Sequence, residues 1–506
     1  MINKLKDIKF LANFSKLKKE KKKKIILCHG DFDFLHLGHI KHLKAAKKIG
    51  DYLIVSITGD KFMTKGYNRP IYTATERAEF LSTIDVVDYV YIDNNISAEN
   101  VISQIKPSYF VKGNEYENLE KDLSGNIKKE RKTLQKVGGK IVFTDEKTFS
   151  SSSLLNISSL SKDLVKKIKT IKKLFSYEKI CKNLEKMKNK KILIIGDTII
   201  DKYIYVSSLG RPSKENIIAS LYEENEIFLG GVFASVGNLS SYSNKIDVIT
   251  TVGKEKEYEK LIKKNVPKNI NKLHLIKNES ITTKKTRFVD KTHSTVKKLY
   301  EIYNMDDFPI NKKIEDRIFN ILNKDLKKYD IVLVNDYGHG LLTNRLIKLL
   351  TKKSKFLCVN AQINAGNKGY NLINRYQKGN YYCLDLNEAR MATKDKYMLP
   401  KKIPQAVLKL CNGKNISLTM GSKGSISTNI KKELFYTPSF TNTVIDTISA
   451  GDAYFTTSAM VLYLTKSLEL SSFIGNLAGA ITVGVRGCVP LNKNTFMNTL
   501  NSYLKT

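Results

Sequence analysis

The sequence predicts an α/β protein made of two domains, each built on a parallel β-sheet. Short apolar runs that end at a glycine alternate with segments of helical periodicity, first from residue 25 and again from residue 191. A lysine-rich stretch at 158–189, which contains neither glycine nor proline, separates the two patterns. The chain has 506 residues, and at roughly 100–200 residues per domain it has room for both. Strands that alternate with helices are typical of parallel sheets covered by helices.

The first domain is expected over 25–157, after a basic extension at 1–24. The apolar runs at 25–29 and 52–57 flank a segment with helical spacing at 37–49, which predicts a strand–helix–strand unit with parallel strands. By the same criteria we expect further strands at 86–92, 108–112 and 140–143, and helices at 73–84 and 97–105.

Two lysine-rich helices are expected to connect the domains over 158–189, because apolar residues recur there at helical spacing. The second domain is expected over 190–506. Its last part, from Ala450, reads as largely helical. Strands are expected at 191–195, 247–252, 330–334, 356–359, 381–384 and 416–419.

Composition excludes several classes of protein. With 42% apolar residues the chain is not expected to be disordered. It contains no run of 18 apolar residues, so a membrane-spanning helix is not expected. Lysines interrupt the apolar positions of 1–24, so we expect no secretory signal. The six cysteines have neither metal-ligand nor redox spacing, which is typical of a reducing cytoplasm.

The strongly basic balance has two interpretations. Lys and Arg number 86 against 49 Asp and Glu, a net charge of +37, which could indicate a nucleic-acid partner. However, lysine far outnumbers arginine and the excess is spread along the whole chain. We therefore expect phosphorylated small molecules rather than a dedicated nucleic-acid partner, and keep a nucleic-acid-binding protein as the rival from another class.

The first candidate site is the segment 30–39, at the junction of a predicted strand and helix. Four of the seven histidines lie within 29–42. A helix N-terminus attracts phosphate through its free N–H groups, and His36 and His39, three residues apart, can donate hydrogen bonds to the same anion. Gly30 and Gly38 allow the backbone to approach a nucleotide.

This stretch resembles the GxFDxxHxGH signature of the cytidylyltransferase-like nucleotidyltransferases. Later segments also resemble that family. Lys65-Gly66 resembles its mobile loop, Arg77 resembles an arginine on one of its helices, and Ser150–Ser153 stands where the family has Ser-Thr-Thr. The resemblance implies in-line attack of a phosphate on a nucleotide, with His36 and His39 catalytic. The implied nucleotide-binding residues are Gly30, Asp31, Phe32, Gly38, Lys65, Arg77, Lys112, Gly113, Ser151 and Ser152. Lys112-Gly113 favours the heptose-1-phosphate adenylyltransferases and therefore ATP, but CTP stays open.

The second candidate site is the segment 446–452, which precedes an apolar helix. Small residues at a helix start can hold an anion, and Asp452 could accept a proton from a substrate hydroxyl while the pocket holds a phosphoryl group. Asp452 could equally be an acidic residue in the first turn of a capped helix.

Residues 446–452 resemble the DTxGAGD signature of the ribokinase-like sugar kinases, which implies that Asp452 is catalytic. Further matching segments span 190–504. The implied sugar-binding residues are Asp201, Gly230, Gly231, Asn238 and Arg287. The implied nucleotide- or anion-binding residues are Glu388, which would also meet Mg²⁺ through water, Thr419, Gly421, Gly424, Ala450, Gly451 and Asn476.

Together the halves resemble the bifunctional heptose-7-phosphate kinases and heptose-1-phosphate adenylyltransferases, with the domain order reversed. The fold implied is a Rossmann-like transferase domain followed by a ribokinase-like domain. The resemblance also implies ATP, Mg²⁺, a phosphorylated sugar, a homodimer, and an activated sugar for lipopolysaccharide or capsule synthesis. Several kinase positions differ, namely Ala234, His339, Asn360, Gln362, Asp385 and Ser449. The alternative is therefore an active nucleotidyltransferase with a degenerate kinase-like domain.

Overall fold

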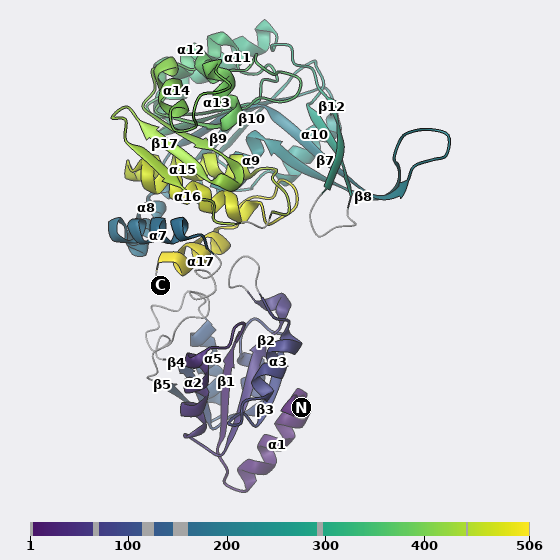
Figure 1. Ribbon diagram of the computed structural model, residues 1–506, viewed down its shortest axis with the longest axis vertical. Coiled ribbons are helices and arrows are strands. Elements are labelled where there is room, and N and C mark those ends of the chain that lie inside the picture. Colours follow the sequence, from purple (N-terminus) through teal and green to yellow (C-terminus); the bar gives the residue numbers. More distant parts are fainter. Residues whose placement is uncertain are drawn as a thin grey trace. The chain divides into compact units, whose positions relative to one another are not determined.

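The computed structural model describes residues 4–63, 70–113, 126–144, 160–290, 297–441 and 444–504 (Figure 1). It divides the chain into two compact units, a first one that comprises Met1–Ser159 and Asn501–Thr506 and a second one from Leu160 to Leu500. Both are α/β, and the predicted fold class is confirmed. Among the described helices, none is both long and apolar enough to span a bilayer.

The first unit is built on a five-stranded sheet with the order β3-β2-β1-β4-β5, and all its pairings are parallel. The strands are β1 (Ile25–Gly30), β2 (Tyr52–Thr58), β3 (Tyr89–Asp93), β4 (Tyr109–Gly113) and β5 (Lys140–Thr144). The helices are α1 (Ile8–Glu20), α2 (Leu37–Lys47), α3 (Ala74–Ser82), α4 (Glu99–Ile105) and α5 (Asn126–Lys136).

Alternate residues of β1 face two separate cores. Ile26 and Cys28 pack with α2 and α3 on one face of the sheet, whereas Ile25 and Leu27 pack with α1, α4 and α5 on the other. Because both faces are covered, the strands are apolar throughout, as the sequence indicated.

Helix α1 was not predicted within the basic stretch 1–24. Asp7 caps it by accepting a hydrogen bond from the Phe10 N–H, and Leu11 is fully buried in the core beside α4. The Ser15 hydroxyl donates to the Ile105 carbonyl at 2.7 Å. This part of the extension is therefore an integral element of the first unit.

The two lysine-rich helices are α7 (Lys162–Leu174) and α8 (Tyr177–Glu185), and both belong to the second unit. Ser161 and Ser176 cap them through their side-chain oxygens. Lys167 on α7 forms an ion pair of 2.5 Å with Glu469 in the first turn of α16.

The second unit contains a nine-stranded sheet with the order β10-β9-β6-β13-β14-β15-β16-β17-β18. Its pairings are parallel from β10 to β16 and antiparallel for β17 and β18. The strands are β6 (Ile192–Gly196), β9 (Ile246–Val252), β10 (Lys272–Lys277), β13 (Ile331–Asp336), β14 (Leu357–Ala361), β15 (Tyr381–Asp385), β16 (Asn415–Thr419), β17 (Ser425–Asn429) and β18 (Leu434–Thr437). The remaining helices of the chain are α9 (Val232–Ser240), α10 (Lys256–Asn265), α11 (Lys312–Asp325), α12 (Asn344–Lys353), α13 (Leu386–Thr393), α14 (Ile403–Cys411), α15 (Ala450–Thr465), α16 (Leu468–Thr482) and α17 (Lys493–Leu504).

A four-stranded sheet, which the sequence did not predict, lies beside the large one with the order β12-β11-β7-β8. Its strands are β7 (Thr198–Gly210), β8 (Ala219–Gly231), β11 (Lys284–Asp290) and β12 (Lys297–Asn304). The far end of the β7–β8 hairpin projects from the body of the second unit (Figure 1). We refer to this sheet as the side sheet.

Replacement of Leu11 tests whether α1 stabilises the first unit. Leu11→Ala should lower the free energy of unfolding by about 2–5 kcal/mol, because it leaves a cavity in a closed core. Leu17→Ala on the exposed face of the same helix should change it by less than about 0.5 kcal/mol. Urea denaturation of the full chain measures both, and equal effects would contradict the packing of α1.

Candidate active sites

The first candidate site lies where the strand order of the five-stranded sheet reverses direction. The connections that follow β1 and β4 lead away on opposite sides, and ligands of open α/β sheets bind at the carboxyl ends of such strands. The segment 30–39 follows β1, and Lys112 and Gly113 end the neighbouring strand β4. The topology thus brings two motifs together that are some 80 residues apart in the sequence.

His36 and His39 stand side by side at the start of α2. Their rings are stacked, with centroids 4.0 Å apart and planes inclined by 26°. His36 Nδ1 accepts a hydrogen bond from the Gly38 N–H at 3.0 Å, so the proton of the neutral ring is on Nε2. Burial lowers the pKa of His36 and keeps it neutral near pH 7. His36 Nε2 has no hydrogen-bond partner among the described residues, and the ring can therefore donate to an anion.

Phe32 and Asp33 shape the turn before these histidines. Phe32 has a positive φ of 46°, and its ring packs over Gly30, where a Cβ would lie 3.2 Å from the ring. The Asp33 carboxylate accepts a hydrogen bond from the Ile71 N–H at 2.7 Å. Both side chains are buried, so these motif residues hold the turn in place.

Arg77 on α3 is almost fully buried and contacts protein groups rather than an open crevice. Its guanidinium donates to the carbonyls of Tyr72, Asp31 and Thr58 at 3.0, 2.5 and 2.9 Å. It also pairs with the Asp60 carboxylate at 2.6 Å. The structure thus gives Arg77 a different place from the expected phosphate contact, as a residue that fixes the loops after β1 and β2.

Lys112 lies at the carboxyl end of β4 and is buried. Its ammonium is 3.4 Å from the Glu130 carboxylate on α5 and 3.5 Å from the His29 carbonyl. Glu130 in turn accepts a hydrogen bond from the Ala98 N–H at 3.0 Å. The sequence did not single out Glu130, which holds the Lys112 side chain toward β1. The predicted nucleotide ligands Lys65, Ser151 and Ser152 lie outside the described residues.

The second candidate site centres on Asp452, in the first turn of α15. Its carboxylate is buried, and Oδ1 accepts hydrogen bonds from the Tyr337 hydroxyl at 2.7 Å and from Gln362 Nε2 at 3.2 Å. Burial raises the pKa of Asp452 to about 6, although the hydrogen bonds act in the opposite direction. Such a carboxylate is ionised near pH 7 and basic enough to accept a proton.

The start of α15 next to Asp452 is open. Ser449 precedes the helix with a positive φ of 65° and does not cap it with its side chain. A Cβ on Gly451 would meet no atom within 4 Å. Gly451 therefore presents its backbone, without a covering side chain, next to Asp452 in the chain.

The side sheet carries the predicted sugar contacts. Asp201 on β7 pairs with Arg287 on β11, and both are buried. A Cβ on Gly230 would lie 2.2 Å from the Asp201 carboxylate, and Gly231 has a positive φ of 60°. Both positions therefore require glycine. Arg287 also donates to Glu301 at 3.1 Å.

Lys285 was missed by the sequence reasoning. It lies directly beside Asp201 in the register of β7 and β11, and it is buried against the ring of Tyr303 at 5.1 Å. Burial lowers its pKa, while Asp201 opposes this. Its charge also acts on Asp452. The sequence could have indicated Lys285, because it lies two residues before the candidate Arg287 and residues two apart on a strand share a face.

Asn238 on α9 is buried. Its amide donates to the Thr456 hydroxyl on α15 at 3.4 Å, and its carbonyl oxygen accepts from the Leu491 N–H at 2.8 Å. The Asn238 amide is thus paired with protein groups of two other segments, and its role as a sugar ligand stays a prediction.

The predicted nucleotide side lies at the ends of β15 and β16. Glu388 and Asp385 form a capping box at the start of α13, and both Glu388 oxygens accept backbone N–H bonds, from Asp385 at 2.7 Å and from Ile363 at 3.0 Å. Burial raises the pKa of Glu388 to about 8. Of the described residues, no three His, Cys, Asp or Glu side chains are arranged to hold a metal ion.

Thr419, Gly421 and Gly424 form the turn between β16 and β17. Gly424 has a φ of 80°, and a Cβ there would lie 2.0 Å from the Thr437 carbonyl, whereas Gly421 faces open space. Asn476 on α16 donates to the Ser425 hydroxyl at 2.6 Å. It is therefore attached to the strand that follows this turn.

Comparison with known families assigns both halves. Residues 27–159 match the family described as cytidylyltransferase-like, and residues 189–494 match the pfkB family of carbohydrate kinases.

Curated relatives match the N-terminal part. The bifunctional protein HldE of Geobacter metallireducens is 37% identical over 115 residues, 22% of this chain and 24% of the relative. That of Campylobacter concisus is 39% identical over 140 residues, 27% of this chain and 29% of the relative. The matching region thus spans less than a third of the length of these relatives.

Among solved structures, phosphofructokinase-2 from Escherichia coli in complex with potassium matches with a TM-score of 0.50 and 14% identity. The match covers 63% of this chain and all of that chain. At this identity the likeness concerns the fold alone.

Replacement of Arg77 distinguishes an anchoring role from nucleotide contact. Arg77→Lys keeps the charge but loses several hydrogen bonds in a buried place, so we expect about 2–4 kcal/mol less free energy of unfolding. Arg131→Lys on the exposed face of α5 should have no such effect. Urea denaturation of the full chain measures both. Unchanged stability with weaker nucleotide binding would contradict the anchoring role.

Proposed function

The chain belongs to the pfkB family of carbohydrate kinases, and from this we propose that it phosphorylates a sugar or sugar phosphate. From the cytidylyltransferase-like match over 27–159 we propose that it also activates a sugar 1-phosphate with a nucleotide. The second unit transfers the γ-phosphoryl group of ATP to a sugar hydroxyl. The first unit joins a sugar 1-phosphate to a nucleotide and releases pyrophosphate. The two steps need not follow one another directly.

The observation that carries the proposal is the buried Asp452 carboxylate at the open start of α15. In the kinase step this carboxylate accepts the proton of the attacking hydroxyl as the new O–P bond forms and ADP leaves. Tyr337 holds the carboxylate in position through the hydrogen bond of 2.7 Å. The open space at Gly451 allows the transferred phosphoryl group to approach the backbone there.

The transferase step uses the paired histidines. An oxygen of the sugar phosphate attacks the α-phosphorus of the bound nucleotide, and the bond to the leaving pyrophosphate breaks. Negative charge that gathers on the phosphate oxygens is stabilised by the His36 Nε2–H and by His39 beside it. No covalent enzyme intermediate is required, so positioning and charge stabilisation provide the catalysis.

A phosphorylated sugar is the substrate class that the side sheet favours. Lys285 and Arg287 bring two buried cations to the face that carries Asp201. Asp201 and Glu301 neutralise Arg287, whereas no described residue forms a hydrogen bond or ion pair with the Lys285 ammonium. Heptose phosphates are the first compounds to test, because Lys112-Gly113 resembles the matching segment of the heptose-1-phosphate adenylyltransferases. We place the product in the synthesis of lipopolysaccharide or capsule.

Mg²⁺ fits this chain as a companion of the nucleotide phosphates. Both Glu388 oxygens already accept backbone N–H groups, so Glu388 and Asp385 would meet the ion through water, as is common for Mg²⁺. When bound, the ion neutralises charge on the transferred phosphoryl group. ATP serves the kinase, and either ATP or CTP serves the transferase. We also predict that the protein acts in the cytoplasm and that it forms a homodimer.

Reciprocal variants of the full chain test the two activities separately. Asp452→Asn should lower kcat/KM for phosphorylation of heptose 7-phosphate by about 10²–10⁴-fold, because it removes the base, and should leave nucleotide transfer unchanged. His39→Ala should lower nucleotide transfer to heptose 1-phosphate, measured with an equal mixture of ATP and CTP, and should leave phosphorylation unchanged. Mass spectrometry of the products identifies the sugar and the base.

The outcomes of this experiment separate the alternatives. Transfer without phosphorylation would establish a transferase with a degenerate kinase domain. Absence of both reactions with any phosphosugar would overturn the proposal. A steep salt dependence of DNA affinity in the same preparation would favour the nucleic-acid rival.

The pH dependence of the kinase follows from the raised pKa of Asp452. The base acts as the carboxylate, so kcat/KM for phosphorylation should fall as pH decreases through about 6. An unperturbed aspartate would hold its activity down to about pH 4. A pH–rate profile of the full chain with saturating ATP measures the midpoint, and a midpoint near 4 would contradict Asp452 as the buried base.

A further inference from the structure

Helix α1 and the residues after it carry a surface that neither candidate mechanism uses. The helix lies on the outside of the first unit (Figure 1), and Leu11 and Ser15 are its buried residues. Seven of the nine residues at 16–24 are lysines, and Glu20 is the one acidic residue among them. This is an excess of six positive charges in nine residues, against 37 in 506 for the whole chain.

Most of these lysines have no acidic partner. Of the seven, only Lys23 forms an ion pair with a described residue, Asp51, at 3.0 Å. The ammonium groups of Lys18 and Lys24 lie over aromatic rings, which leaves their charge in place. The positive charge of this segment is therefore largely not neutralised within the protein.

A second segment adds to this charge. Lys106, at the C-terminal end of α4, is exposed. Burial lowers the pKa of Lys19, and the charge of Lys106 lowers it further, so the two ammonium groups repel each other. An anionic partner would relieve this repulsion. We refer to the following residues as the basic patch: Lys16, Lys19, Lys21, Lys22, Lys24 and Lys106.

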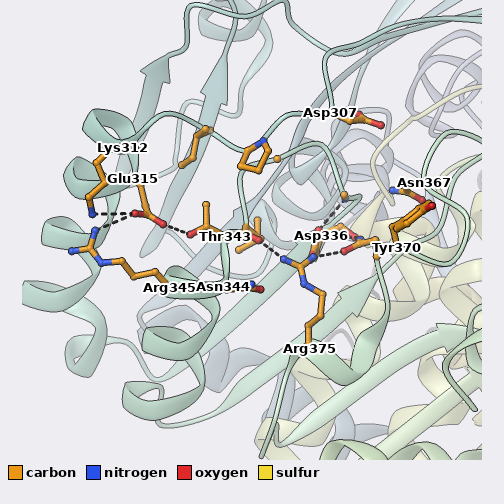
Figure 2. A pocket seen from close by; sticks show the side chains of 16 residues that line it. Asp307, Lys312, Glu315, Asp336, Thr343, Asn344, Arg345, Asn367, Tyr370 and Arg375 are labelled. Atoms are coloured by element: carbon orange, nitrogen blue, oxygen red, sulfur yellow. Dashed lines mark hydrogen bonds and ion pairs between the residues drawn. The ribbon is translucent and has the colours of Figure 1, made fainter.

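Cations elsewhere in the chain are paired. In a pocket of about 630 Å³ in the second unit, Lys312 and Arg345 both contact Glu315 (Figure 2). Both also pair with Asp316. The positive charge at that pocket is thus neutralised by neighbouring carboxylates, whereas the charge of the basic patch is available to a partner.

The basic patch lies at the opposite end of the sheet from the candidate transferase site. Lys24 directly precedes β1, and Lys106 comes shortly before β4. His36 follows β1, and Gly113 ends β4. At roughly 3.3 Å per residue, β1 separates the two ends by about 20 Å. A flat partner that contacts the amino ends of these strands therefore leaves their carboxyl ends open.

Two large apolar side chains accompany the lysines on α1. Phe10 and Leu17 are 40 and 58% exposed, and because seven residues make about two helical turns, they lie on the same side of the helix. Lys9 and Lys16 directly precede them and are exposed. Exposed apolar side chains among lysines are typical of helices that bind the surface of an anionic membrane.

The composition of the patch favours a membrane over a nucleic acid. Residues 1–24 contain no arginine, which is the side chain suited to bidentate contacts with phosphates and bases. Lysine is a hydrated point charge that is attracted to an anionic surface without a fixed geometry.

We propose that the basic patch binds the surface of a membrane that contains anionic phospholipids, with Phe10 and Leu17 at the level of the headgroups. The contact is electrostatic and reversible, because no segment enters the bilayer deeply. It is independent of the two proposed activities, and its test needs no substrate.

Sedimentation with lipid vesicles tests the proposal. The full chain should bind vesicles of phosphatidylcholine that contain about one third phosphatidylglycerol, and should not bind vesicles of phosphatidylcholine alone. The affinity should fall by about tenfold or more when the salt concentration rises from about 0.1 to about 1 M, because salt screens the attraction.

Lysine variants of the full chain identify the surface. The patch variant replaces four lysines by glutamine, namely Lys16, Lys19, Lys21 and Lys22. It should bind the anionic vesicles at least about tenfold more weakly, because each lysine near such a membrane adds to the affinity. The matched control removes the same charge from exposed positions of the lysine-rich helix α7, namely Lys166, Lys169, Lys172 and Lys173. Its affinity should stay within about threefold of that of the unchanged chain, because salt screens distant charges.

Leu17→Ser tests the apolar part of the contact. It should weaken vesicle binding by about three- to tenfold through the loss of apolar burial, and it should leave the salt dependence unchanged. Circular dichroism of each variant checks the fold, since none of the replaced side chains is buried in the core.

Three results would refute membrane binding by this patch. The first is no sedimentation with the anionic vesicles, and the second is an equal loss of affinity in the α7 control. The third is tighter binding to duplex DNA than to the vesicles, lost in the patch variant and unaffected by Leu17→Ser, which would assign the patch to a nucleic acid.

Discussion

The kinase unit depends on the burial of acidic groups at the carboxyl end of its large sheet. Asp197, just after β6, is buried and accepts the N–H groups of Tyr337 and His339 at 2.9 and 3.3 Å. Tyr337 in turn directs its hydroxyl to Asp452. A buried carboxylate without such donors would be costly. The parallel pairing of β6 with β13 brings donor and acceptor together, and the position of the candidate base follows from it.

In the first unit the buried charged group that needs hydrogen-bond partners is a cation, Arg77. Arg77 satisfies its donors with carbonyls of the segments after β1 and β2 and with Asp60. These segments include the turn that leads to His36 and His39. Because that turn has a residue with positive φ at Phe32, it requires such support to keep one conformation. In both units, therefore, a buried charged side chain fixes a backbone segment of the candidate site: Asp197 in the second unit and Arg77 in the first.

The central strands could be predicted from the sequence, whereas the side sheet could not. Strands β1, β6 and β13 are buried on both faces and read as apolar runs. Strand β8 exposes most of its residues, and its charged residues conceal its alternation. The motifs placed candidate residues at strand ends and helix starts, but they did not show which protein groups each side chain contacts. Arg77 and Asn238 form hydrogen bonds with protein groups far away in the sequence. Such partners cannot be predicted from a local motif, because they depend on how distant segments pack. Lys285 was hidden among many surface lysines.

Two of the positions at which the kinase half departs from the family pattern, Asn360 and Gln362, belong to one hydrogen-bond network that reaches Asp452. Gln362 donates to Asp452 at 3.2 Å and to the Asn360 side-chain oxygen at 2.8 Å, and Asn360 donates to the Cys383 carbonyl at 2.9 Å. Here the two amides continue the hydrogen bonds from β15 to the candidate base, and buried polar groups with matched partners are costly to replace singly. Replacement of either amide alone therefore removes a hydrogen-bond partner from its neighbour in this network.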